Sequence, residues 1–173
     1  MMARQIAPGL RRTFSFEDWN WVDDRLIQEV RTEASKKINR DLVLDIMGTD
    51  IDARMVEIAK ENAQKAGVAS DITFKQMRVQ DLRSDKINGV IISNPPYGER
   101  LSDDAGVTKL YAEMGEVFAP LMTWSKFILT SDENFEKKFG RPADKKRKLY
   151  NGTLKVDLYQ FFGERVRRQS SNE

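Results

Sequence analysis

The sequence contains no cysteine and no histidine. Without cysteine, the chain can form neither a disulfide framework nor a thiolate metal site. Without histidine, it lacks the usual general base and the commonest metal ligand of proteins. These two absences exclude Ser-His-Asp hydrolysis and most zinc chemistry, so we expect no resident metal.

Long apolar runs are also missing. No stretch approaches the roughly 18 apolar residues of a membrane span, and the first residues lack the apolar segment of a secretory signal. We therefore expect a cytoplasmic protein without a membrane partner. At 173 residues, the chain is expected to form one domain over residues 1–173.

Positive and negative residues nearly balance, with a formal net charge of +2, but basic residues gather near the end of the chain. Such a cluster can bind phosphate groups. It can equally protect a solvated strand edge from aggregation, and charge alone favours neither interpretation. The candidate phosphate contacts in this cluster are Lys145, Lys146, Arg147 and Lys148.

Strand and helix patterns alternate along most of the chain. Apolar residues at helical spacing predict a helix from Phe16 to Ile38 with Ser15 as its N-cap. Strands are expected over 42–48, 72–77, 88–93 and 125–130, and helices over 52–67 and 110–120. Asn151-Gly152 predicts a terminal hairpin of strands 145–150 and 153–162. This order predicts an α/β fold with a mostly parallel sheet and an antiparallel C-terminal edge.

Two tryptophans fall inside the first predicted helix. Trp19 and Trp21 are two positions apart, and residues at that spacing do not share a helix face. We expect one of them in the core and the other partly exposed, and we assign neither to RNA.

The most informative stretch is Ser93-Asn94-Pro95-Pro96-Tyr97-Gly98, which follows the apolar run 90–92. The exocyclic amine of a nucleobase is a poor nucleophile because its lone pair is delocalised into the ring. A site that methylates it needs acceptors for both amine hydrogens and a flat surface for the ring. Asn94 supplies a side-chain carbonyl, Pro95 a main-chain carbonyl and Tyr97 an aromatic face. Because the prolines fix φ and keep the turn extended, the stretch predicts methyl transfer to a planar nitrogen.

Two acidic residues follow earlier predicted strands. Asp50 stands where doubly wound folds hold ribose hydroxyls. Asp81 is able to accept a hydrogen bond from the amino group of an adenine, although either acid alone is more simply explained as a loop or cap residue. The carboxyl ends of parallel strands share one edge of a sheet, where ligands bind. Together with Asn94, these acids predict a cleft for a nucleoside cofactor and a target base.

The chain resembles the S-adenosylmethionine-dependent methyltransferases. Within them it resembles the RNA methylase group of bacterial large-subunit ribosomal RNA guanine-N2 methyltransferases and THUMP-associated tRNA guanine-N2 enzymes. Asn-Pro-Pro-Tyr by itself is shared with adenine-N6 and glutamine-N5 methyltransferases, whereas Gly98-Glu99-Arg100-Leu101 and Ile6-Ala7-Pro8-Gly9 are more particular to the ribosomal RNA group. The matching stretches are Ile6-Ala7-Pro8-Gly9-Leu10, Phe14-Ser15-Phe16-Glu17, Gly48-Thr49-Asp50-Ile51-Asp52 and the nine residues from Ser93 to Leu101.

This resemblance implies S-adenosylmethionine as the cofactor, with Asp50 and Ile51 at its ribose, Asp81 at its adenine and Asn94 beside it. It implies that Asn94 and the Pro95 carbonyl hold the target amine, that Pro96 completes the turn and that Tyr97 stacks on the flipped base. Arg100 is able to contact phosphate or to pair with Glu99 or Asp103. The implied reaction is methylation of guanine N2 in 23S ribosomal RNA. The alternatives are adenine-N6 in DNA, guanine-N2 in tRNA, or an inactive module that binds RNA or a partner through the basic hairpin.

The resemblance further implies a Rossmann-like class I methyltransferase sheet whose first strand and glycine-rich loop this chain lacks. In that fold the first strand lies centrally, between the predicted strands at 42–48 and 88–93. We therefore expect a part of a longer enzyme, with two exposed inner edges and with weak or no cofactor binding of its own. Self-association is one way to fill such a gap.

Overall fold

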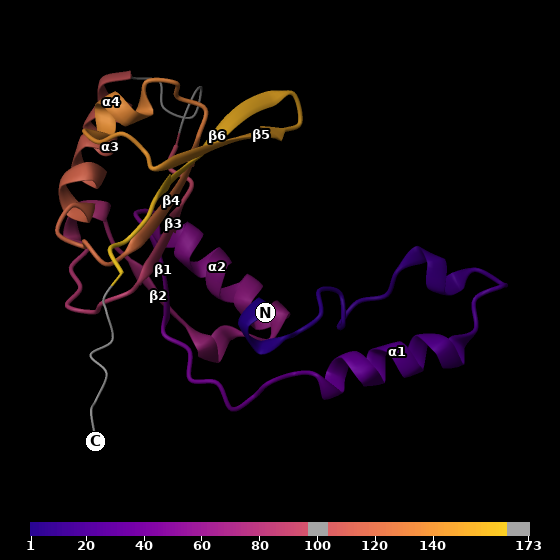
Figure 1. Cartoon of the computed structure of the whole chain (residues 1–173). Helices are drawn as coiled ribbons and strands as arrows, with labels where there is room; N and C mark the ends of the chain where they lie inside the picture. The colour runs from indigo at the N-terminus through magenta and orange to yellow at the C-terminus, as the bar shows by residue number, and fades with distance from the viewer. Residues whose placement is uncertain (97–103, 166–173) are drawn as a thin grey trace. The chain divides into compact units, whose positions relative to one another are not determined.

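The computed structural model describes residues 1–96 and 104–165 (Figure 1). It divides into two compact units, Met1–Met77 and Arg78–Glu173. The expected single domain stays a prediction. In the part of the chain that the structure describes, no helix is both long and apolar enough to cross a membrane.

The first unit contains a parallel β-α-β arrangement. Strand β1 (Ile46–Asp50) pairs with β2 (Ile72–Gln76), and α2 (Ala53–Ala66) connects them, followed by the short 3-10 helix η3 (Ala69–Asp71). The Asp52 side chain accepts a 2.8 Å hydrogen bond from the Arg54 backbone N–H and so caps α2, and Gly67 ends the helix at a φ of 70°. The predicted helix 52–67 is confirmed. The first strand begins at Ile46 rather than at Leu42.

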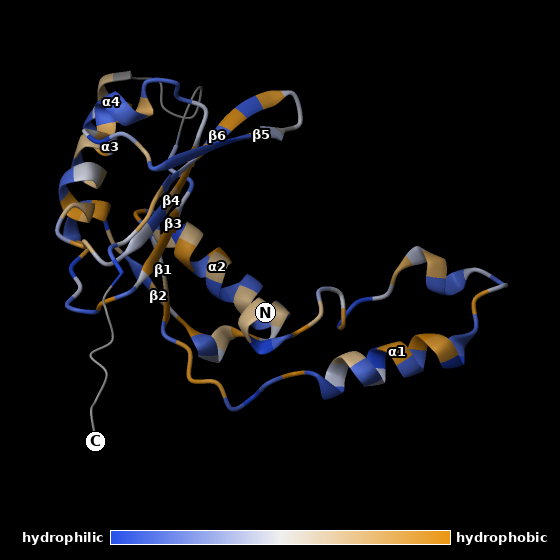
Figure 2. Ribbon diagram, in the orientation of Figure 1, coloured by the Kyte–Doolittle hydropathy of each residue, from blue (hydrophilic) through white to orange (hydrophobic). Residues whose placement is uncertain are grey.

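The predicted helix from Phe16 to Ile38 is confirmed over Asp24–Lys36 only, and its predicted start is wrong. The segment instead contains the 3-10 helix η2 (Ser15–Asp18) and then α1 (Asp24–Lys36), which follow η1 (Met2–Arg4) at the N-terminus. Asp23, not Ser15, caps α1, because its side chain accepts a 2.8 Å hydrogen bond from the Arg25 backbone N–H. Hydrophobic and hydrophilic residues alternate along α1 (Figure 2), and none of its residues is buried.

The second unit contains a four-stranded sheet in the order β3-β4-β6-β5. Strands β3 (Val90–Ser93) and β4 (Ser125–Thr130) are parallel, and β6 (Leu154–Phe161) runs antiparallel to both β4 and β5 (Lys145–Asn151). Gly152, at a φ of 63°, makes the turn between β5 and β6. The expected α/β fold with a C-terminal antiparallel hairpin is confirmed.

Helices α3 (Asp104–Phe118) and α4 (Phe135–Phe139) belong to the core of this unit. Gly115 lets them approach closely, since a Cβ at this position would lie 2.1 Å from the Phe139 carbonyl oxygen. The 3-10 helix η4 (Val79–Asp81) contributes Val79 to the edge of the same core. The buried members of the core are Val107, Tyr111, Met114, Phe118, Ile128, Phe135, Phe139, Tyr159 and Phe161.

Two edge strands, β1 and β3, expose apolar side chains. Within the described residues, β1 pairs only with β2, and β3 pairs with β4 but with no other strand. On β3, Val90 and Ile92 are exposed, Ile92 to 82%. On β1, Ile46 and Met47 are exposed as well. Both strands therefore lack a partner on one side within the described residues, and the expectation that they border a missing strand stays a prediction.

Candidate active site

The Asn-Pro-Pro turn begins where β3 ends. Asn94 is exposed, Pro95 is buried and Pro96 is half-buried. The two prolines have no N–H of their own and keep the backbone extended. The Asn94 side chain therefore faces solvent, while the next residue, Pro95, is buried and anchors the turn.

A buried chain of hydrogen bonds holds this turn from the side of α3. The hydroxyl of Tyr111 lies 3.4 Å from the Pro96 carbonyl oxygen, to which it donates, and 2.9 Å from Oγ1 of Thr130. Thr130 Oγ1 also accepts a 3.1 Å bond from the Asp132 backbone N–H. Both Tyr111 and Thr130 are fully buried. Burial raises the pKa of Tyr111, so its hydroxyl keeps the proton that it donates.

The acidic loop after β1 is fixed by its own backbone and by β2. Asp50 Oδ1 accepts a 2.8 Å hydrogen bond from the Asp52 backbone N–H. Gln76, at the end of β2, donates from Nε2 to the Ile51 carbonyl oxygen at 3.0 Å. Ile51 itself is an exposed apolar side chain. The loop thus presents a carboxylate next to an apolar surface at the carboxyl end of a parallel strand, which is where α/β folds bind nucleosides.

Asp81 lies in η4, at the start of the second unit, and is exposed. Its backbone N–H donates to the Arg78 carbonyl oxygen at 3.1 Å. The flanking Val79 and Leu82 pack against the core of the unit. Two apolar anchors therefore hold a short turn whose acidic side chain faces solvent.

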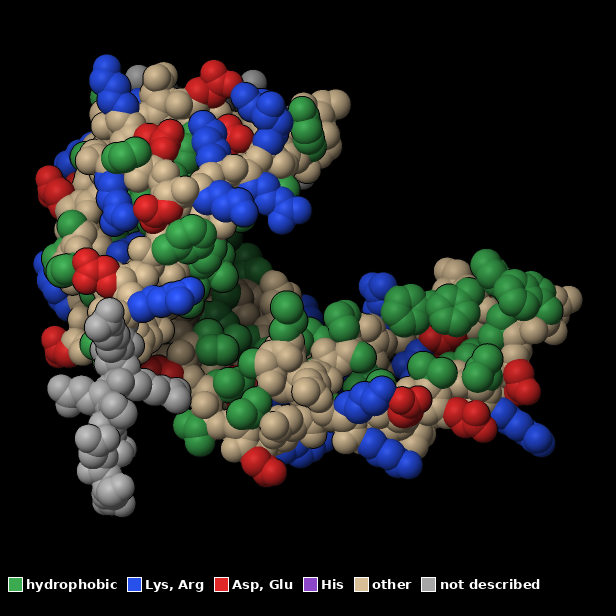
Figure 3. Space-filling view, in the orientation of Figure 1, with side chains coloured by type: hydrophobic (Ala, Val, Ile, Leu, Met, Phe, Trp, Pro, Cys, Tyr) green, Lys and Arg blue, Asp and Glu red, His purple; other side chains and the backbone are tan. Residues whose placement is uncertain are grey.

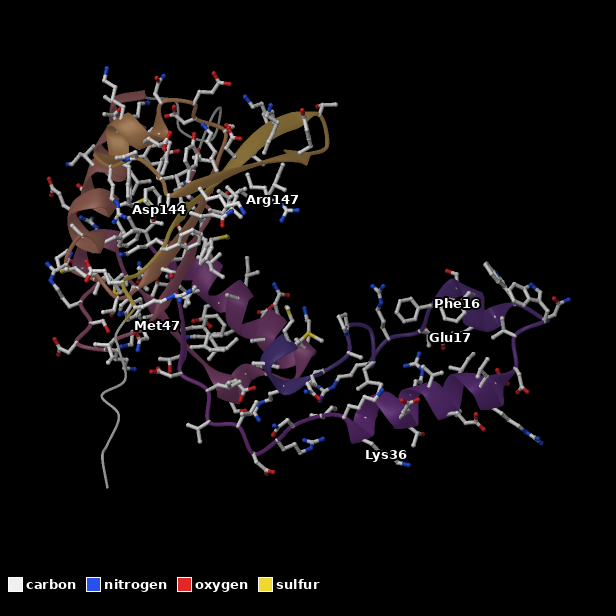
Figure 4. The ribbon with its side chains drawn as sticks, viewed as in Figure 1. Phe16, Glu17, Lys36, Met47, Asp144 and Arg147 are labelled. Carbon is white, nitrogen blue, oxygen red and sulfur yellow. The ribbon has the colours of Figure 1, made fainter. Side chains whose placement is uncertain are left out.

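The basic cluster lies on β5, where the strand places alternate side chains on opposite faces. Lys146 points to the face of Tyr159, with its Nζ 4.6 Å from the ring centroid and 3.7 Å from Asp157 Oδ2. Hydrogen bonding with Tyr159 raises the pKa of Lys146. Lys145 and Arg147 pair with Gln160 and Leu158 in the register and so lie on the other face (Figure 4).

The structure therefore divides the four candidate RNA contacts into two pairs. Lys146 and Lys148 share one face, where Lys146 already contacts an acid and an aromatic ring. Lys145 and Arg147 share the other. Of the remaining candidates, Tyr97 and Arg100 lie outside the described residues. Within the described ranges, no three acidic side chains gather as a metal site would require.

Sequence reasoning missed three residues that position the candidate site: Gln76, Tyr111 and Thr130. Tyr111 carries only a helical-spacing signal in the sequence, because it falls between apolar neighbours of α3. Nothing local to Thr130 or Gln76 points to the loops that they support. The contacts Gln76–Ile51, Tyr111–Pro96 and Tyr111–Thr130 join residues 15 to 25 positions apart along the chain.

Comparisons with known proteins agree with this architecture. Residues 1–160 match the family model described as "RMKL-like, methyltransferase domain". The protein named "Putative RNA methyltransferase YpsC" of Bacillus subtilis is 50% identical over 164 residues, which are 95% of this chain and 43% of that protein. "Ribosomal RNA large subunit methyltransferase K/L" of Shewanella amazonensis is 38% identical over 175 residues, covering 97% of this chain and 25% of that protein.

A solved structure gives the same result. The crystal structure of SMU.472, described as "a putative methyltransferase complexed with SAH", is 62% identical and superposes with a TM-score of 0.92. The match covers 96% of this chain and 44% of that one. The chain thus spans less than half the length of each of these three proteins. With the family model matched over residues 1–160 and the fold shared at this identity, the chain belongs to the RMKL-like methyltransferase domain family.

Proposed function

We propose that this domain transfers a methyl group from S-adenosylmethionine to the exocyclic N2 amine of a guanine in 23S ribosomal RNA. The observation that carries the proposal is the Asn94-Pro95-Pro96 turn, in which an exposed amide is followed by a buried proline and by a carbonyl held by Tyr111. The Asn94 side chain and the Pro95 main chain supply the two acceptors that a flat NH2 group needs. The Shewanella relative, named for large-subunit ribosomal RNA, supports the choice of RNA.

The acidic loops have the donor chemistry to hold the cofactor. The Asp50 carboxylate accepts hydrogen bonds from the ribose hydroxyls of the cofactor, and the exposed Ile51 side chain supplies an apolar surface beside the ribose. Asp81 accepts a hydrogen bond from the adenine amino group. When bound, S-adenosylmethionine supplies an electrophilic methyl group on a positively charged sulfur. SMU.472, crystallised with SAH, supports this assignment.

In the proposed step, the lone pair of the amine nitrogen forms the new N–C bond while the C–S bond breaks. The products are the methylated amine and S-adenosylhomocysteine, and the amine releases one proton to water. Asn94 and the Pro95 carbonyl accept hydrogen bonds from the amine hydrogens, which stabilises the positive charge that builds on nitrogen. The chain needs no histidine or cysteine for this step, because the leaving group is already activated.

Methyl incorporation tests the proposal. The protein, as expressed from its gene, is incubated with labelled methyl donor and with naked 23S ribosomal RNA, tRNA or DNA. Nuclease digestion and mass spectrometry are expected to find N2-methylguanosine in the ribosomal RNA alone. N6-methyladenine in DNA, or N2-methylguanosine confined to tRNA, would assign the same site to one of the alternative substrates.

Replacing Tyr111 with phenylalanine tests how the turn is held. Loss of the hydroxyl removes the donor to Pro96, so we expect kcat to fall by about tenfold or more while KM changes little, because small shifts of reacting groups are costly. The free energy of unfolding should fall by only about 1 kcal/mol. Tyr150→Phe, on an exposed tyrosine of β5, serves as the matched control. An unchanged kcat in the Tyr111 variant would reduce this residue to a purely structural role.

Two further proposals concern partners. Lys145 and Arg147, which share a face of β5, are proposed to contact RNA phosphates. Salt-dependent RNA binding without methyl-donor binding would favour the inactive RNA-binding alternative.

The exposed apolar residues of the edge strands β1 and β3 support self-association. Sedimentation velocity at two concentrations tests the second proposal, and a monomer at both contradicts it. The cytoplasmic location stays a prediction.

A further inference from the structure

Four aromatic rings follow one another on the surface of the segment ahead of α1. The Phe14 and Phe16 rings are stacked 5.7 Å apart, Phe16 meets Trp19 edge-on at 6.5 Å, and Trp19 lies 5.1 Å from Trp21. Trp19 is 50% exposed and Trp21 is 75% exposed. The space-filling view shows hydrophobic side chains gathered here (Figure 3). We call these four residues the aromatic strip.

The strip has a different arrangement from the one that its sequence suggested. Trp19 and Trp21 are not on a helix, since η2 ends at Asp18 and α1 begins at Asp24. The two indoles therefore come into contact instead of pointing apart, and both are exposed. The expectation that one of them is a core residue is wrong.

An arginine of α1 fixes the backbone beneath the strip. Arg31 donates from Nη1 to the Leu10 carbonyl oxygen at 2.9 Å and from Nη2 to the Arg12 carbonyl oxygen at 2.8 Å. The same guanidinium pairs with Glu17 at 2.5 Å, and Glu17 accepts a 3.2 Å hydrogen bond from the Phe14 backbone N–H. These bonds tie α1 to the chain on both sides of Phe14 and Phe16. The backbone that carries Phe14 and Phe16 is therefore held in place before any partner arrives, which lowers the cost of ordering it on binding.

The far end of the strip is a shallow surface depression, largely open to solvent and lined by Asp18, Trp19, Asn20 and Trp21. The centre of a protein–protein interface is usually depleted of charged residues, and this depression mixes rings with a carboxylate and an amide. That combination suits a nucleobase, because indoles stack on its face while Asp and Asn bond to its edge. Guanine is favoured, since its N1–H and N2–H donors match the two carboxylate oxygens of Asp18.

The other end of the strip carries a cation. The Arg12 guanidinium lies 4.4 Å from the centroid of the Phe14 ring. Surfaces that bind single-stranded nucleic acid combine stacking rings with basic groups that follow the backbone phosphates. A base over Trp19 and Trp21, with its strand running toward Arg12, would use both parts of the strip.

We propose that the aromatic strip is a second nucleobase site, which stacks an unpaired guanine of the RNA and orients the strand on the enzyme. The choice of RNA as ligand rests on the proposed function. The site needs no methyl donor, so its occupancy is measured separately from catalysis.

Intrinsic fluorescence of the 173-residue chain tests the site directly. Two of the three tryptophans belong to the strip, and the third, Trp124, is partly buried in the second unit with its Nε1 donating to the Lys86 carbonyl oxygen. Stacked bases are expected to quench the emission of the strip. The probes are the six-nucleotide RNAs UUGUUU, UUAUUU and UUUUUU, added without methyl donor, and the first is expected to bind most tightly.

Matched variants decide the outcome. Trp21→Ala is expected to weaken binding of UUGUUU about fivefold or more, and Asp18→Asn should remove the preference for guanine while UUUUUU binding persists. Phe162→Ala, on an exposed ring of the second unit outside β5, should leave the affinity unchanged. Equal affinity of the Trp21 variant and the unchanged chain would overturn the proposal. A blue shift of the emission that grows with protein concentration in the absence of RNA would also overturn it, because a second copy would then cover the strip.

Discussion

Replacing Asn94 with alanine is expected to lower kcat for methyl transfer by about 10²–10³-fold, with little change in the KM for RNA. The side chain is exposed at the end of β3, so its removal costs the fold little. Its carbonyl is proposed to act on the amine as charge develops there, and losing one such preorganised group typically has an effect of this size. Initial rates of methyl incorporation, measured on 23S ribosomal RNA with the protein expressed from its gene, give both constants.

The control for this variant is Asn62→Ala, on an exposed residue of α2. It should leave both kinetic constants unchanged. Calorimetric titration with S-adenosylhomocysteine separates a loss of chemistry from a loss of cofactor binding, since Asn94 is also a candidate neighbour of the cofactor. A variant that keeps its full kcat would refute the assignment of the Asn-Pro-Pro turn as the place where the amine is held.

Elements marked by short-range signals were predicted well. Asp52 and Gly67 bound α2 because a side-chain acceptor at the N-cap and a left-handed glycine after the last turn act within a few residues. Asn151-Gly152 likewise indicated the hairpin, and Gly152 has the positive φ that the turn requires. The alternation of strands and helices was enough for the fold class.

The start of α1 and the helix α4 were not predicted. Helical spacing alone predicted a helix that includes Trp19 and Trp21. The N-cap is Asp23, so α1 begins only at Asp24. Helix α4 has only five residues, too few to be stable by itself. It exists because Phe135 and Phe139 are buried in the second unit.

The candidate site, too, was predicted only in part. The order of Asp50, Asp81 and Asn94 along the chain, each after a strand, could be read from the sequence, and their meeting at one edge stays a prediction. The supports of the site could not be read from it, since Gln76 and Tyr111 reach their carbonyl partners only after the sheets and helices have packed. The basic strand β5 shows a further limit. The sequence shows four basic residues in a row, but only the strand register shows that they lie on two opposite faces.

The largest expected loss of stability comes from Phe135→Ala. Phe135 is fully buried, and its ring lies 4.9 Å from Tyr111, 5.1 Å from Phe139, 4.7 Å from Tyr159 and 6.5 Å from Phe161, measured between centroids. Truncating such a ring typically costs about 3–5 kcal/mol, because the cavity closes only in part. Urea denaturation followed by the fluorescence of Trp124, in the same unit, measures the change.

Phe162→Ala is the matched control, because Phe162 lies just after β6 and is 49% exposed. We expect it to change the free energy of unfolding by about 0.5 kcal/mol or less. The Phe135 variant should also affect the turn, since the ring packs edge-on against Tyr111, whose hydroxyl holds the Pro96 carbonyl. A Phe135 variant within about 1 kcal/mol of the unchanged chain would contradict the role of this ring as the centre of the core. Normal stability combined with a lowered kcat would instead place its main effect on the position of the Asn-Pro-Pro turn.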